Sequence, residues 1–262
     1  MKRTVLNKVK TAFTFSWAGI ILLILFFAPV QIRAQEDGDI VKELLKTADI
    51  LNETILDITA LSDDEENAVG KELDKQISND LRFTKERKFN LKKIFNNLIK
   101  YVERKNINYN YKVVQTDEVN AFAIAGGYMY VNTGILDFLD NENEIAFVIA
   151  HEISHNELRH CIKRVQYAVL ASSVDPSFGE IVQTAYSIYS MPFSKYDEFD
   201  ADENGVSLML KAGYNKSGAV SFFEKLEELE KEYGMDQRDP LNDFVSSHPT
   251  ARERRDRVIN MH

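Results

Sequence analysis

Two histidines and a glutamate in residues 151–155 have the types and spacing of a zinc-hydrolase site. His151 and His155 lie four positions apart, which on an α-helix separates them by about 40° in azimuth, so both imidazoles can bind one metal ion. Glu152 lies about 100° round the helix from His151, close enough to take a proton from a zinc-bound water without binding the metal. The motif therefore predicts half of a catalytic zinc site.

The same motif can arise by chance on a solvated helix, so the elements that position it matter. Residues 144–150 are almost all apolar, which predicts a helix that enters the core. Asn141 and Glu144 have the spacing of an N-cap and its capping partner, so the helix is expected to begin there. A buried helix suits a rigid metal site.

A catalytic zinc ion usually has three protein ligands and one water, so a third ligand is needed. Glu198 and Asp202 lie four positions apart in an acidic run and would share one helical face. Glu198 is the preferred third ligand, and Asp202 would orient a ligating imidazole through its free N–H. By itself, the run would also fit an ordinary solvated face.

Histidine is scarce, with five in the chain. His160 follows the motif by five residues and is expected to support the site or the fold rather than to bind metal. His248 precedes a proline, which favours an extended backbone that could lean over a cleft, and the residue alone leaves its role open. Cys161 is the single cysteine; we expect a buried thiol rather than a ligand, and no intrachain disulfide can form.

Taken together, four blocks of the sequence resemble the HtpX-like and CAAX-prenyl-endopeptidase-like zinc metallopeptidases, which are gluzincins. The resemblance spans roughly residues 66–258. The four blocks are residues 120–131, residues 151–160, residues 198–202, and His248-Pro249 followed by Arg254.

The resemblance implies one Zn²⁺ per chain, bound by His151, His155 and Glu198, with Glu152 as the general base. It implies that Asp202 supports the site and assists as a proton donor. His248 would approach the metal, either as a resting ligand or as a group that stabilises the tetrahedral intermediate. Three further positions are expected to support the site, namely Asn120, His160 and Arg254.

A glycine pair precedes an alternating apolar segment that the resemblance assigns to substrate binding. Physically, the pair reads as a tight turn that feeds a strand. The strand could be part of an ordinary hairpin, but the resemblance favours an edge strand that docks an extended peptide. The family often has proline before the two glycines, where this chain has alanine. The residues expected to bind substrate are Gly126, Gly127, Tyr128, Met129 and Tyr130.

The first 34 residues are typical of an export signal, with basic residues before a long apolar run. The run is also near the length of a bilayer span, so it could remain as an uncleaved anchor that contacts the membrane. We expect residues 1–34 to be a signal peptide or signal anchor, 35–62 an additional helix, and 63–262 the catalytic domain. The protein would then work in the periplasm or cell envelope.

The net charge of the chain argues against one class of partner. The leader holds five of the 32 basic residues and no acidic residue, so residues 35–262 carry a net charge near −14. Such an acidic domain is a poor partner for nucleic acid.

Hydrophobic periodicity predicts an α+β, mostly helical, zincin-like domain with a small β-sheet beside the metal helix. Helices are expected over 39–61, from a Ser62–Glu65 capping box onward, over 80–104, and over 221–233, with a first strand over 109–115. Residues 165–191 read as a helix-rich excursion near the cleft.

These features predict a zinc metalloendopeptidase that cleaves polypeptides, and the resemblance implies unfolded or misassembled envelope proteins as substrates. An alternative is a latent protease that acts mainly as a zinc-bound chaperone or substrate-binding module. A purely structural zinc site would need four protein ligands and would leave Glu152 without a role.

Overall fold

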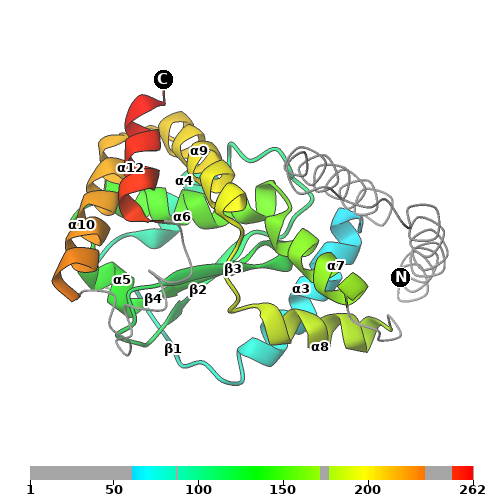
Figure 1. Ribbon diagram of the computed structural model, residues 1–262. Helices are drawn as coiled ribbons and strands as arrows, with labels where there is room; N and C mark the ends of the chain where they lie inside the picture. The colour runs from blue at the N-terminus through cyan, green and yellow to red at the C-terminus, as the bar shows by residue number, and fades with distance from the viewer. Residues whose placement is uncertain (1–60, 87, 172–176, 234–249, 262) are drawn as a thin grey trace, which may run out of the picture.

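A computed structural model describes residues 61–86, 88–171, 177–233 and 250–261 of the chain. Figure 1 shows a small sheet with helices on both sides. The helices are α3 (Asp63–Ile77), α4 (Leu91–Leu98), α5 (Thr133–Phe138), α6 (Glu142–Glu157), α7 (His160–Ala171), α8 (Phe178–Ile188), α9 (Lys195–Lys211), α10 (Ser217–Tyr233) and α12 (Ala251–Asn260). The strands are β1 (Phe83–Thr84), β2 (Asn110–Val114), β3 (Ala121–Ile124) and β4 (Tyr128–Asn132). The mostly helical α+β prediction is confirmed.

The four strands lie in the order β1-β2-β4-β3, with β4 parallel to β2 and antiparallel to β3. The segment 128–131 was predicted to be an edge strand, and this is wrong: β4 is internal and β3 is the edge. The reason is topological, because the hairpin between β3 and β4 folds back outside β4, whose other side is already paired with β2. The alternative of an ordinary hairpin within the sheet is the one that the fold adopts.

The register shows which backbone groups β3 leaves available at its outer side. The N–H of Asn132 donates to the carbonyl of Asn120 at 3.1 Å, and hydrogen-bonded pairs recur every two residues in an antiparallel ladder. Ala121 and Ala123 occupy the intervening, non-hydrogen-bonded positions of that ladder. Their N–H and C=O groups therefore point away from β4, and the N–H of Ala123 donates to the carboxylate of Glu152.

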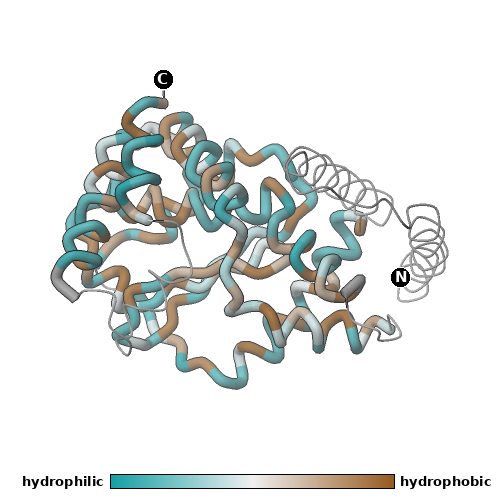
Figure 2. Tube along the Cα trace, viewed as in Figure 1, coloured by the Kyte–Doolittle hydropathy of each residue, from teal (hydrophilic) through white to brown (hydrophobic). Residues whose placement is uncertain are grey.

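Each face of the sheet is covered by its own hydrophobic core. One core joins the sheet to α4, α6, α9, α10 and α12, and the other joins it to α3, α7 and α8. Figure 2 shows hydrophobic segments along α6 and the strands, whereas much of α10 and α12 is hydrophilic. The helix α6 has 13 of its 16 residues buried, as expected for a helix that carries a rigid site.

Two helices begin at the N-caps that the sequence predicts, whereas a third helix has different bounds from those predicted. Asn141 caps α6 by accepting hydrogen bonds from the N–H groups of residues 143 and 144, and Ser62 forms a capping box with Glu65 at the start of α3. The helix predicted over 80–104 is shorter. Residues Phe83–Thr84 pair with β2 instead, and Asn90 caps a helix that ends at Leu98.

The Gly126-Gly127 turn is packed into the interior rather than exposed to a substrate. Both glycines have positive φ, 80° and 84°, which only glycine adopts readily. The turn lies against α3, where a Cβ on Gly70 would be 2.1 Å from the carbonyl oxygen of Ala125. In the strand that follows, Tyr130 has no exposed surface. These contacts explain the glycines structurally and leave the docking edge to β3.

The predicted leader and the additional helix over 35–62 lie almost entirely outside the described residues. Within the described part of the chain, no helix has both the length and the apolar character needed to span a bilayer. Residues 165–191 contribute α7 and α8, which confirms the expected helix-rich segment.

Candidate metal centre

Two helices that pack against each other, α6 and α9, bring the predicted ligands together. α6 carries His151 and His155 on one face, and α9 presents Glu198 from its first turn. The close approach depends on Gly205, where an added Cβ would be 3.1 Å from the backbone nitrogen of His151. A larger side chain would push α9 away from α6, because that nitrogen is rigid backbone. The helix packing therefore sets the distance between the carboxylate and the imidazoles.

The donor atoms have the separations that a tetrahedral zinc ion requires. The Nε2 atoms of His151 and His155 are 3.1 Å apart, and the oxygens of Glu198 lie 3.4 Å and 3.6 Å from them. Ligands about 2.0–2.1 Å from a tetrahedral ion are about 3.3 Å from one another. All three side chains are buried. Two imidazoles and one carboxylate form the protein donor set of a catalytic zinc site.

A buried ion-pair network contacts His151 at Nδ1, the ring nitrogen that does not face the metal position. Asp202 Oδ1 lies 3.0 Å from His151 Nδ1, so the carboxylate accepts the hydrogen bond that leaves Nε2 facing the metal position. Arg254 of α12 donates to Asp202 through Nε at 2.8 Å and Nη2 at 2.6 Å, and its Nη1 lies 3.1 Å from Glu198. Arg254, which the family resemblance led us to expect near the site, therefore pairs with two acidic groups there.

The network also shifts the protonation of its members. Burial lowers the pKa of His151, but the hydrogen bonds to Asp202 and Glu198 outweigh it and raise the pKa to about 9. Burial likewise raises the pKa of Asp202, but the charge of Arg254 outweighs it, so the net shift is downward. Asp202 therefore remains a carboxylate at neutral pH.

His155 has a different set of neighbours. Its ring stacks on Phe193 with centroids 3.8 Å apart and planes 14° apart. Its Nδ1 lies 3.2 Å from Nδ1 of His160, whose Nε2 is 3.6 Å from Asp197. The structure thus places His160 where the sequence expected it, beside a ligand and not among the three donor groups.

Glu152 lies at the inner end of a cavity of about 740 Å³ that also reaches His155 and the free edge of β3. Burial raises the pKa of Glu152 to about 7, although the charge of His151 acts in the opposite direction. A carboxylate with a pKa near 7 can accept a proton and release it again at neutral pH. Its position and its pKa suit a general base.

The remaining predicted residues lie in different parts of the molecule. Asn120 lines the cavity near Glu152, as do Ala121 and Ala123 of β3. Cys161 is buried, and burial raises the pKa of its thiol, as expected for an unreactive cysteine. His248 lies outside the described residues, so its role stays a prediction.

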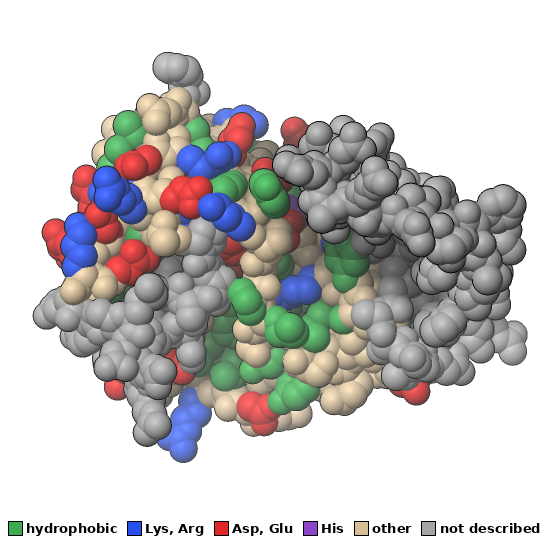
Figure 3. Space-filling view, in the orientation of Figure 1, with side chains coloured by type: hydrophobic (Ala, Val, Ile, Leu, Met, Phe, Trp, Pro, Cys, Tyr) green, Lys and Arg blue, Asp and Glu red, His purple; other side chains and the backbone are tan. Residues whose placement is uncertain are grey.

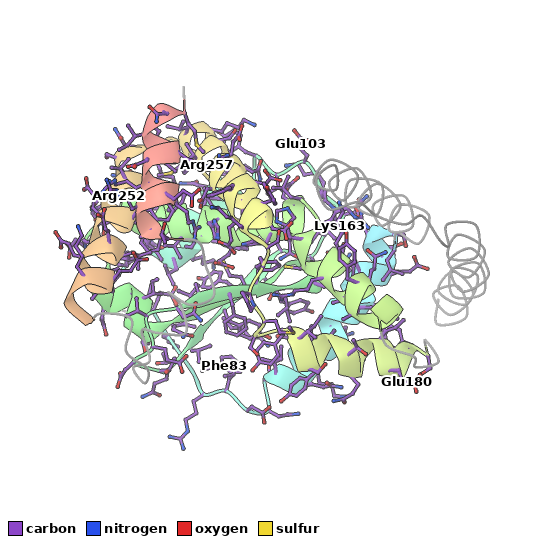
Figure 4. The ribbon with its side chains drawn as sticks, in the orientation of Figure 1. Phe83, Glu103, Lys163, Glu180, Arg252 and Arg257 are labelled. Carbon is purple, nitrogen blue, oxygen red and sulfur yellow. The ribbon has the colours of Figure 1, made fainter. Side chains whose placement is uncertain are left out.

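The four arginines of α12 differ in their exposure. Arg254 is 2% exposed and faces the site, whereas Arg252 and Arg257 are exposed on α12, where Figure 4 labels them. Arg255 is half-buried and pairs with Glu227 of α10.

Three residues that lie at the site were not predicted from the sequence, namely Gly205, Phe193 and Arg164. A signal existed only for Gly205, because a small residue inside an otherwise helical segment indicates close packing. Phe193 and Arg164 reach the cleft through tertiary contacts that no spacing in the sequence encodes.

Comparison with known proteins agrees with this geometry. Metalloprotease LoiP of Escherichia coli (strain K12) is 33% identical over 161 residues, which are 57% of this chain and 62% of the relative. Mitochondrial metalloendopeptidase OMA1 of Arabidopsis thaliana is 32% identical over 157 residues, 56% of this chain and 30% of the relative. Beta-barrel assembly-enhancing protease of Escherichia coli (strain K12) is 26% identical over 136 residues, 45% of this chain and 28% of the relative.

The chain spans less than two thirds of the length of each of these relatives. The family model of peptidase family M48 matches residues 85–261 of this chain. This stretch contains α6, α9 and α12. With two histidines and a glutamate that could hold a metal ion buried together on these helices, the chain belongs to peptidase family M48.

Proposed function

We propose that this protein is a zinc-dependent metalloendopeptidase with Glu152 as its general base. The observation that carries the proposal is the convergence of His151, His155 and Glu198, with donor atoms 3.1–3.6 Å apart, beside the buried Glu152. The relatives named as metalloproteases and as a metalloendopeptidase support the same activity.

The ligand residues and their supports would prepare the site before a peptide arrives. A bound zinc ion supplies Lewis acidity towards the scissile carbonyl and makes water more acidic. Asp202 fixes the His151 ring through Nδ1, and Arg254 keeps Asp202 ionised. This arrangement orients the ligand before substrate enters, so little reorganisation is needed during the reaction.

Glu152 would carry the proton through the reaction. Its carboxylate takes a proton from the attacking water as the carbon–oxygen bond forms. The same carboxyl then gives that proton to the leaving amine as the peptide bond breaks, which returns Glu152 to its starting state. A pKa near 7 favours both halves of this transfer.

The free edge of β3 is the proposed substrate platform. Ala121 and Ala123 direct backbone groups along this edge, and both line the cavity with Glu152. An extended peptide could pair with β3 by strand addition. Pairing through the backbone would tolerate many sequences but would require a locally unfolded substrate.

We further propose unfolded or misassembled proteins of the cell envelope as substrates, with the chain exported by its first 34 residues. The basic and apolar pattern of that segment supports export. One relative is named for enhancing β-barrel assembly, which is consistent with work on envelope proteins. His248 would assist or close the site, as the family resemblance implies.

The test is cleavage of casein and of an unfolded β-barrel protein by full-length, zinc-loaded protein. Glu152→Gln should lower the rate on the order of 10³-fold while zinc remains bound. His248→Ala, assayed in parallel, should raise the rate if the histidine closes the site and lower it if it aids catalysis. Wild-type protein that binds zinc but cleaves neither substrate would contradict the proposal.

The chaperone alternative shares the β3 edge, so it needs a separate readout. Suppression of aggregation by Glu152→Gln protein at wild-type level would favour binding without cleavage. Loss of protection together with loss of cleavage would favour the protease.

A further inference from the structure

The cavity beside Glu152 contains an arginine that the proposed chemistry does not use. Arg164, on α7, lines the cavity with Glu152 and His155. Its guanidinium carbon lies 4.1 Å from the centre of the Phe193 ring, whose other neighbour is His155. Figure 3 shows a basic side chain among hydrophobic ones in a hollow between α8 and α9. One aromatic ring therefore separates this cation from a ligand imidazole.

Among the residues that the structure describes, backbone carbonyls and no carboxylate accept hydrogen bonds from the guanidinium. Nη2 of Arg164 donates to the carbonyl of Tyr189 at 3.2 Å, and Nη1 donates to the carbonyl of Met191. Nε is buried and has no hydrogen-bond partner among the described residues. Each Nη carries two N–H groups, so both retain a donor beyond these bonds. Burial lowers the pKa of Arg164 because a desolvated cation is less stable, but a guanidinium stays protonated at neutral pH.

Two other enclosed arginines, unlike Arg164, form ion pairs with carboxylates. Arg254 and Arg104 each lie within ion-pair distance of two carboxylates, at 2.5–3.1 Å. Arg164 has no such ion pair within the part of the chain that the structure describes. The chain has 41 acidic residues, so carboxylates are not scarce. Of the three enclosed arginines Arg104, Arg164 and Arg254, Arg164 is the one that lines the cleft and the one without an ion pair to a described carboxylate.

We propose that Arg164 is a specificity-determining residue that binds a carboxylate of the substrate near the scissile bond. This inference rests on the proposed peptidase function. A carboxylate would complete the hydrogen bonding of the guanidinium and neutralise a desolvated charge. It could come from an acidic side chain or from the C-terminus of the peptide, and both sources share this chemistry.

The preference should be local to Arg164. Glu152 lines the same cavity, and its charge and those of Asp197 and Glu198 act on Arg164 without forming an ion pair among the described residues. Asp80, Glu118 and Arg82 also line the cavity, but all three are exposed, so water and salt screen their charges. Arg164 is more enclosed and acts more strongly at short range. An acidic residue should therefore help at one position of the peptide and have little effect elsewhere.

The test uses fluorogenic peptides that differ only by Glu or Gln at each position around the cleavage site. Full-length wild-type protein should show a kcat/KM ratio of Glu to Gln of about tenfold at one position. Arg164→Met should reduce that ratio to about one. Arg82→Met removes a different cationic side chain of the same cavity and should leave the ratio unchanged.

Peptides with a free or an amidated C-terminus distinguish the two sources of the carboxylate. An advantage of the free acid that Arg164→Met abolishes would assign the C-terminus, and an advantage of internal Glu would assign the side chain. Equal kcat/KM for all members of the set, or a preference that survives Arg164→Met, would overturn the inference while the peptidase function stands.

A binding measurement covers the case in which no peptide is cleaved. Anisotropy of labelled peptides with zinc-loaded Glu152→Gln protein should show tighter binding of the acidic peptide than of its Gln counterpart. Glu152→Gln combined with Arg164→Met should remove the difference. Equal binding of the two peptides would reject the role of Arg164 independently of turnover.

Discussion

The two imidazole ligands lie one turn apart on α6, yet the fold supports them in opposite ways. His151 is held by charge, through Asp202 and the buried Arg254. His155 is held by a stacked ring, Phe193, and by a second imidazole. The difference teaches that one helix can position two ligands equally while the surrounding elements stabilise them unequally. We expect the charged side of the site to be the more sensitive to substitution.

The largest effect should follow loss of the charge that Arg254 supplies. Arg254→Met leaves Asp202 and Glu198 buried without their cation, which should lower the free energy of unfolding of the metal-free protein by about 3–5 kcal/mol. Urea denaturation followed by circular dichroism measures this loss. Arg252→Met, at an exposed position of the same helix, should stay within about 0.5 kcal/mol of wild type. Equal midpoints for the two variants would remove the basis of the comparison.

The next effect concerns metal affinity. Asp202→Asn weakens the acceptor on His151 and should lower the zinc affinity of the form with a neutral His151 ring about 10–100-fold, as measured by competition with a chromophoric chelator over a range of pH. His160→Gln, the corresponding change on the His155 side, should cost less because it replaces one neutral partner by another. A larger loss in His160→Gln would reverse the proposed order of the two supports.

The pH dependence of stability and of zinc affinity should also reflect the charged surroundings of His151. The raised pKa of His151, about 9, means that the metal-free fold is stabilised by its protonated form. That contribution is complete below the ordinary pKa of about 6.5 and is lost as the pH rises through 9. Zinc needs the neutral ring, so its affinity should rise about tenfold per pH unit between pH 6.5 and 8.

Asp202→Asn should flatten this slope, because the carboxylate that raises the pKa of His151 is gone. Calorimetry in buffers of different ionisation enthalpy counts the protons released on zinc binding. Fewer protons should be released by the variant at pH 7, and an identical number in both proteins would contradict the assignment.

The smallest effect should be on the stacked side. Phe193→Leu keeps an apolar side chain but removes a ring contact of about 0.5–1.5 kcal/mol, which corresponds to roughly 2–10-fold in zinc affinity. Phe193→Tyr should restore the stack. Phe122→Leu removes a ring from the same cavity that stacks on Tyr130 instead, so it should leave zinc affinity unchanged. The absorption spectrum of the Co²⁺-substituted protein reports whether the geometry at His155 has shifted.

Much of the site could be predicted from local periodicity. The i, i+4 spacing of His151 and His155, and of Glu198 and Asp202, depends only on helical geometry. The capping residue Asn141 marked the start of α6 for the same local reason. The order of strands could not be predicted in this way, because β4 becomes internal only when β2 pairs with its other side. The residue types of β3 and β4 fit either position.

By itself, the sequence determined the spacing of the candidate ligands, the candidate general base, the scarcity of histidine and the acidic charge of the chain, because these depend on residue identity and on the helical repeat. The tertiary structure decided which strand offers a free edge, that Gly205 lets α9 approach α6, and that Phe193 and Arg164 reach the cleft. These features depend on packing between segments far apart in the chain. Such contacts form only when the cores on both faces of the sheet are complete.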